Sequence, residues 1–201
     1  MTIDVLRIYE DIAAWFDDNR TRSLMEKPYL DAALSLAREN PAVLDLGCGT
    51  AEPIAAYLIA HGAQVTGVDG AQAMIDMCRA RFPAHTWITA DMRGLALGTQ
   101  FDIIIAWHSF FHLTADEQRA MFAVFAAHLR SGGVLMFTSG SRAGVAWGDM
   151  QGHRVHHDSL APEEYRALGA AHGFKVVQHS EDDPACGNAT VWIMQKGSVS
   201  P

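Results

Sequence analysis

Short apolar runs alternate with amphipathic segments between Pro41 and Gly140 of this 201-residue chain. The runs contain few polar positions, which is typical of strands in a parallel sheet that is covered on both faces. The pattern predicts an α/β fold with helices on both sides of the sheet. The expected strands are 42–46, 64–68, 86–90, 101–107 and 134–139, and the expected helices between them are 52–61, 72–82 and 114–129.

The segment after residue 140 is expected to complete the sheet. Residues 141–160 are polar and glycine-rich and are expected to form a loop, and a helix is expected at 162–171. Two apolar runs, 174–178 and 190–194, are separated by turn residues and predict an antiparallel hairpin. The predicted fold is therefore a Rossmann-like three-layer sandwich with a mostly parallel seven-stranded sheet and an antiparallel C-terminal hairpin.

The carboxyl ends of parallel strands meet at one edge of a sheet, and ligands bind at that edge. The predicted strands end at Gly47–Thr50, Asp69, Asp91 and Trp107–His108, which are far apart in the sequence. We expect these residues to converge on one site.

The clearest chemical signal is the segment 45–49, Asp-Leu-Gly-Cys-Gly, at the end of the first strand. Glycines at such a turn let a ligand lie directly against the backbone, and a dinucleotide pyrophosphate is one such ligand. Asp45 and Glu52 would repel a pyrophosphate and favour a cation. Asp69 lies 20 residues after Gly49 (69 − 49) at the end of the second strand, where an acid binds ribose hydroxyls in nicotinamide and adenosylmethionine enzymes alike.

Over residues 41–140 the chain resembles the class I S-adenosylmethionine-dependent methyltransferases. The matching residues are Asp45 with the glycines that follow it, Asp69, and Asp91 at the end of the third strand. The resemblance implies that Asp69 holds the ribose and that Asp91 and Met92 flank the adenine of S-adenosylmethionine. The residues expected to bind this cofactor are Trp15, Arg20, Asp45, Gly47, Cys48, Gly49, Asp69, Gly70, Met74, Asp91, Met92 and Trp107.

The length of 201 residues predicts one domain, 1–201, in which three regions are expected. Residues 1–40 would be a helical N-terminal lid, 41–140 the cofactor-binding core, and 141–201 a substrate-side loop, helix and final hairpin. Aromatic residues at helical spacing in the first region are either core or lid, and Arg20 could pair with the methionine carboxylate.

His108 and His112 are the expected catalytic residues. His108 follows the fourth strand, where it could contact the cofactor or substrate or act as a general base. His112 has packing or capping as its alternative role. A base is needed only if the acceptor loses a proton, because positioning can supply much of the rate of a displacement on a sulfonium. Segments 106–113 and 135–140 also resemble a group of small bacterial methyltransferases in which an acid often stands at the position of His108.

Other clusters carry weaker signals. Trp107 is either core or a cofactor contact, and Cys48 is expected to be a small packing residue. His153, His156 and His157 lack a further ligand at fixed spacing, so no metal site is predicted; a solvated loop is favoured over a pocket wall.

The amino-acid composition limits the kinds of molecule that this protein is expected to bind. The net charge of −8 and the absence of a basic stripe argue against nucleic acid, as does the lack of Asn-Pro-Pro-Tyr or Asp-Pro-Pro-Tyr after the fourth strand. No apolar run is long enough to predict a membrane span, and the three scattered cysteines suit a cytoplasmic location. The expected acceptor is a small molecule. An NAD-dependent oxidoreductase and a non-catalytic cofactor-binding module are the alternatives.

Overall fold

The computed structural model describes residues 5–197. The first residues of the predicted lid (1–40) and the last residues of the predicted substrate-side region (141–201) lie outside the described residues. The helices are α1 (Val5–Asn19), α2 (Lys27–Leu36), α3 (Ile54–Ala60), α4 (Gln72–Arg81), α5 (Ala115–His128) and α6 (Pro162–Ala171), with short 3-10 turns η1 (Phe110–His112) and η2 (Pro184–Cys186).

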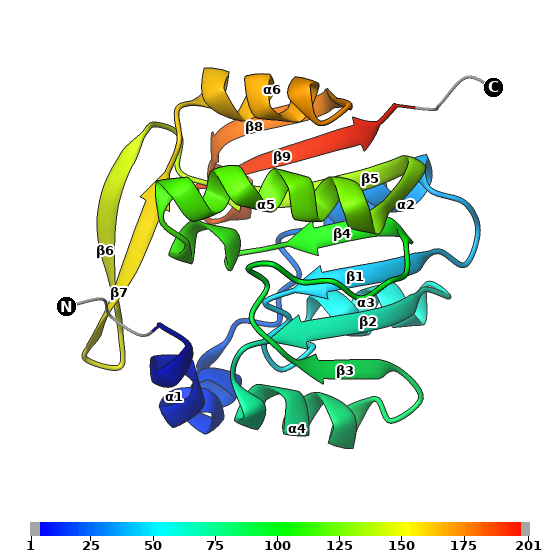
Figure 1. The fold of residues 1–201 in the computed structure, drawn as a ribbon. Helices are drawn as coiled ribbons and strands as arrows, with labels where there is room; N and C mark the ends of the chain where they lie inside the picture. Colours follow the sequence, from blue (N-terminus) through cyan, green and yellow to red (C-terminus); the bar gives the residue numbers. More distant parts are fainter. Residues whose placement is uncertain (1–4, 198–201) are drawn as a thin grey trace.

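Seven strands form one sheet in the order β3-β2-β1-β4-β5-β9-β8 (Figure 1). β1 to β5 are parallel neighbours, whereas β9 is antiparallel to both β5 and β8. The predicted fold class is confirmed, including the C-terminal hairpin. The strands are β1 (Ala42–Leu46), β2 (Gln64–Asp69), β3 (Thr86–Thr89), β4 (Phe101–Ala106), β5 (Leu129–Ser139), β8 (Phe174–Asp183) and β9 (Ala189–Lys196).

Helices cover both faces of the sheet, which explains the uninterrupted apolar strands. Ile103 and Ile105 pack in a cluster with residues of α2, α3 and α4. Ile104, between them, packs in a second cluster with residues of α5 and α6. Successive side chains of a strand point to opposite faces, so a strand with two covered faces must be apolar at every position.

Several predicted boundaries move, most informatively at α5 and α3. α5 begins after Thr114, which caps it together with Glu117 as a capping box, so the predicted N-cap is confirmed. The helix ends at His128, however, and Gly132 and Gly133 do not follow it directly. They lie within β5, at the point where its register with β4 shifts. α3 begins at Ile54 rather than residue 52, because the glycine loop extends further than predicted.

The prediction of a loop at residues 141–160 is wrong, because this segment forms regular strands. It contains a second, two-stranded sheet made of β6 (Gly144–Met150) and β7 (His153–Ser159), here called the ribbon. Its strands are joined by Gln151 and Gly152, both with positive φ (52° and 80°). Two central residues with positive φ make the type I′ turn that suits the twist of a hairpin. The many polar residues and glycines of this segment gave no apolar run from which the strand pairing could be predicted.

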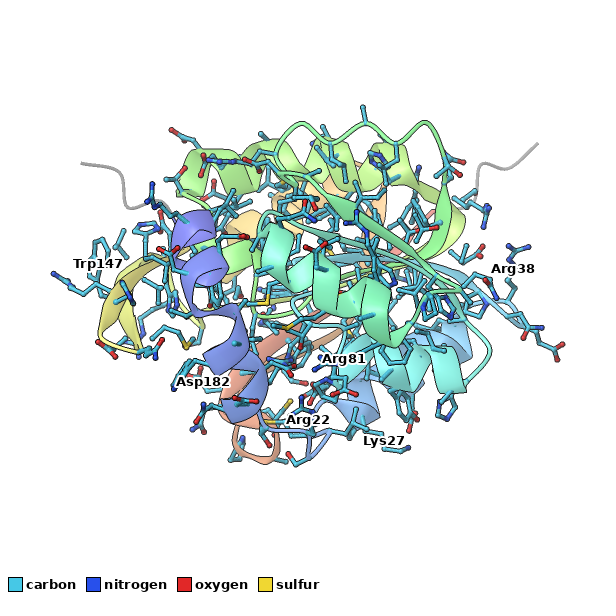
Figure 2. The ribbon with its side chains drawn as sticks, turned by 90° about the horizontal axis from the view of Figure 1, so that it is seen from below. Arg22, Lys27, Arg38, Arg81, Trp147 and Asp182 are labelled. Carbon is cyan, nitrogen blue, oxygen red and sulfur yellow. The ribbon has the colours of Figure 1, made fainter. Side chains whose placement is uncertain are left out.

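The ribbon and α1 both lie beside the carboxyl ends of the parallel strands (Figure 1). α1 packs on α4 through Ala13 and Met74. Its Asp17 accepts hydrogen bonds from Arg22 and Arg81, which Figure 2 shows close to each other beside the end of the helix. Within residues 5–197, no helix is long and apolar enough to cross a membrane.

Replacing Ile104 by alanine should lower the free energy of unfolding by about 2–5 kcal/mol, because the side chain is fully buried and leaves a cavity. Val177→Ala is the control: this side chain is 47% exposed, and its truncation should cost no more than about 0.5 kcal/mol. Urea unfolding of both variants measures the difference. Equal losses would contradict a core that covers both faces of the sheet.

Candidate active site

A cavity of about 820 Å³ lies at the carboxyl ends of the parallel strands, between α1 and the ribbon. It brings together nearly all of the site residues that were predicted from the sequence. Those that line it are Arg20, Asp45, Gly47, Cys48, Gly49, Asp69, Gly70, Met74, Asp91, Met92, Trp107, His108 and His112.

Trp15 is the predicted site residue that the structure does not bring to the cavity. Its helix faces the cavity with Tyr9, Phe16 and Arg20, which are spaced seven and four residues apart. Consecutive residues of an α-helix point about 100° apart, so Trp15 is turned away from the face that Phe16 occupies. Hydrophobicity alone could not distinguish the two neighbouring aromatic residues.

The glycine loop requires glycine at position 47. Its φ is +71°, and a Cβ there would lie 2.2 Å from the Cβ of Ser109. The Gly47 N–H donates to the Val68 carbonyl at 2.7 Å, and the Ser109 hydroxyl donates to the Leu46 carbonyl at 2.6 Å. These bonds hold the end of β1 against β2 and against the segment after β4.

Asp69 fixes the other side of this loop. One carboxylate oxygen accepts from the Gly49 N–H and the other from the Ala71 N–H, each at 2.9 Å. Burial raises the pKa of Asp69, although these N–H groups oppose the shift. Each carboxylate oxygen has a second lone pair, so Asp69 can still accept hydrogen bonds from a ligand in the cavity.

Asp45 adds a second carboxyl to this end of the cavity. Burial raises its pKa to about 7, the nearby positive charge of Arg20 lowers it, and the charge of Asp69 raises it further. Arg20 is held by a hydrogen bond from its Nε to the Glu52 carbonyl at 2.9 Å and lies 3.8 Å from the Glu26 carboxylate. A cationic ligand would relieve the cost of burying the two acids.

Asp91 lies at the third strand end, as predicted, but it already has a partner. Arg93 donates to its two oxygens through Nε at 3.0 and 2.8 Å and through its backbone N–H at 2.9 Å. Burial raises the pKa of Asp91, but these bonds outweigh it and the net shift is downward. Arg93 also pairs with Glu117 at 2.6 Å, so the three charges form one network on the cavity wall.

His112 joins three segments of the chain. Its Nδ1 lies 2.9 Å from the His156 carbonyl, which can only accept, so the proton is on Nδ1. The Tyr9 hydroxyl then donates to Nε2 at 3.1 Å. Burial lowers the pKa of His112 to about 4. Both ring nitrogens are therefore occupied in a neutral ring that connects α1, η1 and the ribbon.

His108 has a freer side chain. It has a φ of +50°, and its backbone N–H donates to the Thr138 hydroxyl at 2.8 Å. The cavity exposes the imidazole, yet the surrounding walls desolvate it; this lowers its pKa to about 4, with Arg20 adding to the effect. A neutral ring facing the cavity can donate or accept a hydrogen bond, but it is a weak base.

Two further residues combine a packing role with a place on the wall. Trp107 is 5% exposed and its ring lies 6.2 Å from that of Tyr29, so it belongs to the core and also lines the cavity. Cys48 is buried beside Cys78, and burial raises the pKa of its thiol. The predicted packing role of Cys48 agrees with this environment.

Sequence reasoning missed the contribution of the ribbon. Trp147 and Met150 line the cavity, and His156 and His157, favoured above as part of a solvated loop, line it as well. The signal that could have found them is Gln151-Gly152 between two segments that each contain a valine, because a glycine in a two-residue turn favours a hairpin.

Comparisons with known proteins agree with this geometry. Residues 43–133 match the model of a family described as a methyltransferase domain. An amino pentose methyltransferase from Micromonospora echinaspora has the same fold, with a TM-score of 0.71 at 22% identity over 94% of this chain and 96% of its own. Residues 43–133 thus resemble a methyltransferase domain, and the described fold is that of solved S-adenosylmethionine-dependent methyltransferases.

Two curated relatives of this methyltransferase domain act on different molecules. The malonyl-[acyl-carrier protein] O-methyltransferase of Salmonella typhimurium is 29% identical over 75% of this chain and 61% of its own length. The dTDP-3-amino-3,4,6-trideoxy-alpha-D-glucopyranose N,N-dimethyltransferase of Streptomyces venezuelae is 31% identical over 53% and 45%. The chain thus aligns with about half the length of these relatives.

The described residues of the methyltransferase domain fit S-adenosylmethionine. The glycine loop leaves its backbone open to the cavity, and Asp69 has lone pairs for ribose hydroxyls. The acidic end formed by Asp45 and Asp69 suits a sulfonium and an ammonium group better than a pyrophosphate. Met92 offers an apolar surface for a base beside the Asp91–Arg93 pair.

Gly47→Ala should destabilise the methyltransferase domain by clearly more than Gly94→Ala. Gly94 has a similar φ of +66° but no atom within 4 Å of an added Cβ, so it isolates the backbone strain of about 1–2 kcal/mol. Gly47 adds the collision with Ser109. Thermal and urea unfolding of both variants give the comparison, and equal losses would mean that the loop opens freely at Gly47.

His112→Asn should make stability less dependent on pH between about 4 and 6.5. The unfolded chain protonates histidine near pH ~6.5, and folded His112 only near about 4, so wild-type stability falls as the pH falls through this window. Removing the imidazole should reduce that slope by up to about 1.4 kcal/mol per pH unit. His153→Asn, on an exposed ribbon residue, is the control and should keep the wild-type slope in urea unfolding.

Proposed function

We propose that this protein transfers a methyl group from S-adenosylmethionine to a small-molecule acceptor by in-line displacement. The observation that carries the proposal is Asp69, which bonds the Gly49 and Ala71 N–H groups while it faces the cavity. An acid so fixed, next to an open glycine backbone, is arranged to hold the ribose of a nucleoside. A site for a dinucleotide pyrophosphate does not suit these acids, and a non-catalytic cofactor-binding module would not need the part of the cavity that the cofactor leaves free.

When bound, the cofactor would supply a methyl carbon activated by its positively charged sulfur. A lone pair of the acceptor would bond to that carbon, and the electrons of the broken carbon–sulfur bond would stay with the sulfur. Arg20 would pair with the methionine carboxylate, and Asp45 would accept from the ammonium group. Asp91 and Met92 would border the adenine. These residues act by binding and orienting, which can account for much of the rate of such a displacement.

His108 would lie beside the acceptor, because it follows β4 and its ring faces the cavity. Since its pKa is about 4, we assign it a role in positioning the acceptor through a hydrogen bond rather than in strong base catalysis. His112 would have to give up a bond to Tyr9 or His156 to act on a proton, so we propose that it holds α1 and the ribbon together.

Relatives and charge both support a small acceptor. The Streptomyces relative is named for a nucleotide-linked amino sugar. The net charge of −8 agrees with this choice. The cytoplasmic location stays a prediction of the sequence.

S-adenosylhomocysteine should raise the melting temperature of the wild-type protein. A ligand at about a hundred times its Kd stabilises by about 2.7 kcal/mol, which corresponds to about 5–10 °C for a protein of this size. Asp69→Ala and the milder Asp69→Asn should both lose most of this shift. Asp76→Ala on α4, whose side chain is 63% exposed, should keep it.

Thermal melts with and without S-adenosylhomocysteine make the measurement. A wild-type protein that does not respond would reject the cofactor assignment. A full response in both Asp69 variants would reject the proposed role of Asp69 but not the cofactor assignment.

A further inference from the structure

The cavity has two chemically different ends. The end at β1 and β2 carries the acids and the open glycine backbone described above. The other end is formed by η1, the residues just before it and the ribbon, and its wall includes His108, Phe111, His157 and Met150. If the cofactor occupies the first end, as the proposed function requires, the second end is left for the acceptor.

Aromatic rings make up most of this second end. The Phe111 ring lies 4.6 Å from His157 and 4.9 Å from His112, and His112 lies 4.9 Å from His157. His108 joins the group at 5.6 Å from Phe111. Four rings from two separate segments therefore form one continuous wall.

The position of His157 is set by its own strand pair. It stands on β7 opposite Ala146, diagonal to Gly148 on β6. A Cβ at Gly148 would lie 2.9 Å from the His157 ring, so the missing side chain leaves the space that the ring fills. The ribbon is thus shaped to hold this ring against Phe111.

The wall carries little charge. Burial lowers the pKa of His108 and of His112 to about 4 and also lowers the pKa of His157, so all three rings are neutral near pH 7. Arg93, which lines the same cavity, is already paired: it forms ion pairs with Asp91 and Glu117 and is not free to bind an anion. Arg20, near His108, is balanced by Glu26 and Asp45.

We propose, on the basis of the function proposed above, that the acceptor is a flat, uncharged aromatic or heteroaromatic molecule that lies against the Phe111–His157 wall. An aromatic ligand would be stabilised by edge-to-face and stacking contacts with the rings of this wall. A carboxylate or phosphate would be desolvated there without a free cation to bind it. A ring hydroxyl or N–H could bond to a neutral imidazole, and its oxygen or nitrogen would then receive the methyl group while its proton leaves to water or imidazole.

Four matched probes test the class of acceptor without knowledge of its identity. They are naphthol, naphthoate, naphthylmethylamine and the saturated alcohol decahydronaphthol, which differ in charge or in flatness but share the same fused pair of six-membered carbon rings. Binding to the wild-type protein saturated with S-adenosylhomocysteine would be measured by ligand-observed NMR at pH 7. Naphthol should bind at least about tenfold more tightly than each of the others, a difference of about 1.4 kcal/mol.

Variants locate the site. Phe111→Leu and His157→Leu keep an apolar side chain but remove a ring, and each should weaken naphthol binding about three- to tenfold, in line with the energy of one aromatic contact. His153→Leu, on the exposed tip of the same ribbon, should leave it unchanged. Tighter binding of naphthoate, of the amine or of the saturated alcohol, or equal loss in all three variants, would overturn the proposal.

The test separates this inference from the proposed function. A protein that is stabilised by S-adenosylhomocysteine but prefers a charged or saturated probe remains a methyltransferase with another acceptor class. A protein that does not bind S-adenosylhomocysteine at all contradicts the proposed function instead.

Discussion

The site depends on the two hydrogen bonds from backbone N–H groups to the Asp69 carboxylate. One comes from Gly49 in the loop after β1 and the other from Ala71 at the start of α4. The same side chain thus sets the distance between two strand ends and faces the cavity. Because its oxygens keep free lone pairs, the residue that orders the loop can also hold a ligand. The glycine at position 47 lets the backbone approach Ser109 closely enough for this arrangement to form.

The electrostatics of the cavity follow from burial. Asp45 and Asp69 lie where water is scarce, so the pKa values of both carboxyl groups rise and both gain from a nearby cation. Arg20, the residue directly after α1, supplies part of that positive charge. The histidines at the other end respond in the opposite way, because burial favours the neutral imidazole. Burial thus favours the uncharged form of the side chains at both ends, so the carboxyl groups gain from a cationic ligand and the imidazoles stay neutral.

Closure of the cavity depends on contacts between segments that are distant in the sequence. The Tyr9–His112–His156 chain of hydrogen bonds connects α1, η1 and the ribbon. Asp17 and Arg81 connect α1 to α4 at its other end (Figure 2). α1 is therefore held at both ends, and the ribbon is held to it through a histidine whose ring has no free nitrogen.

The sequence alone determined the layers, the strand ends and most of the cofactor end of the cavity, because apolar periodicity, glycine spacing and acids at strand ends are local signals. It placed Asp45, Gly47, Gly49 and Asp69 at the edge where the structure has them. It did not determine the ribbon, because the polar residues around Gln151-Gly152 resemble those of an ordinary loop. It did not decide between Trp15 and Phe16 either, because the side of a helix that faces the cavity depends on what the helix packs against. The state of His112 was likewise decided only by tertiary structure, because its partners Tyr9 and His156 are remote in the chain and burial of the ring between them lowers its pKa.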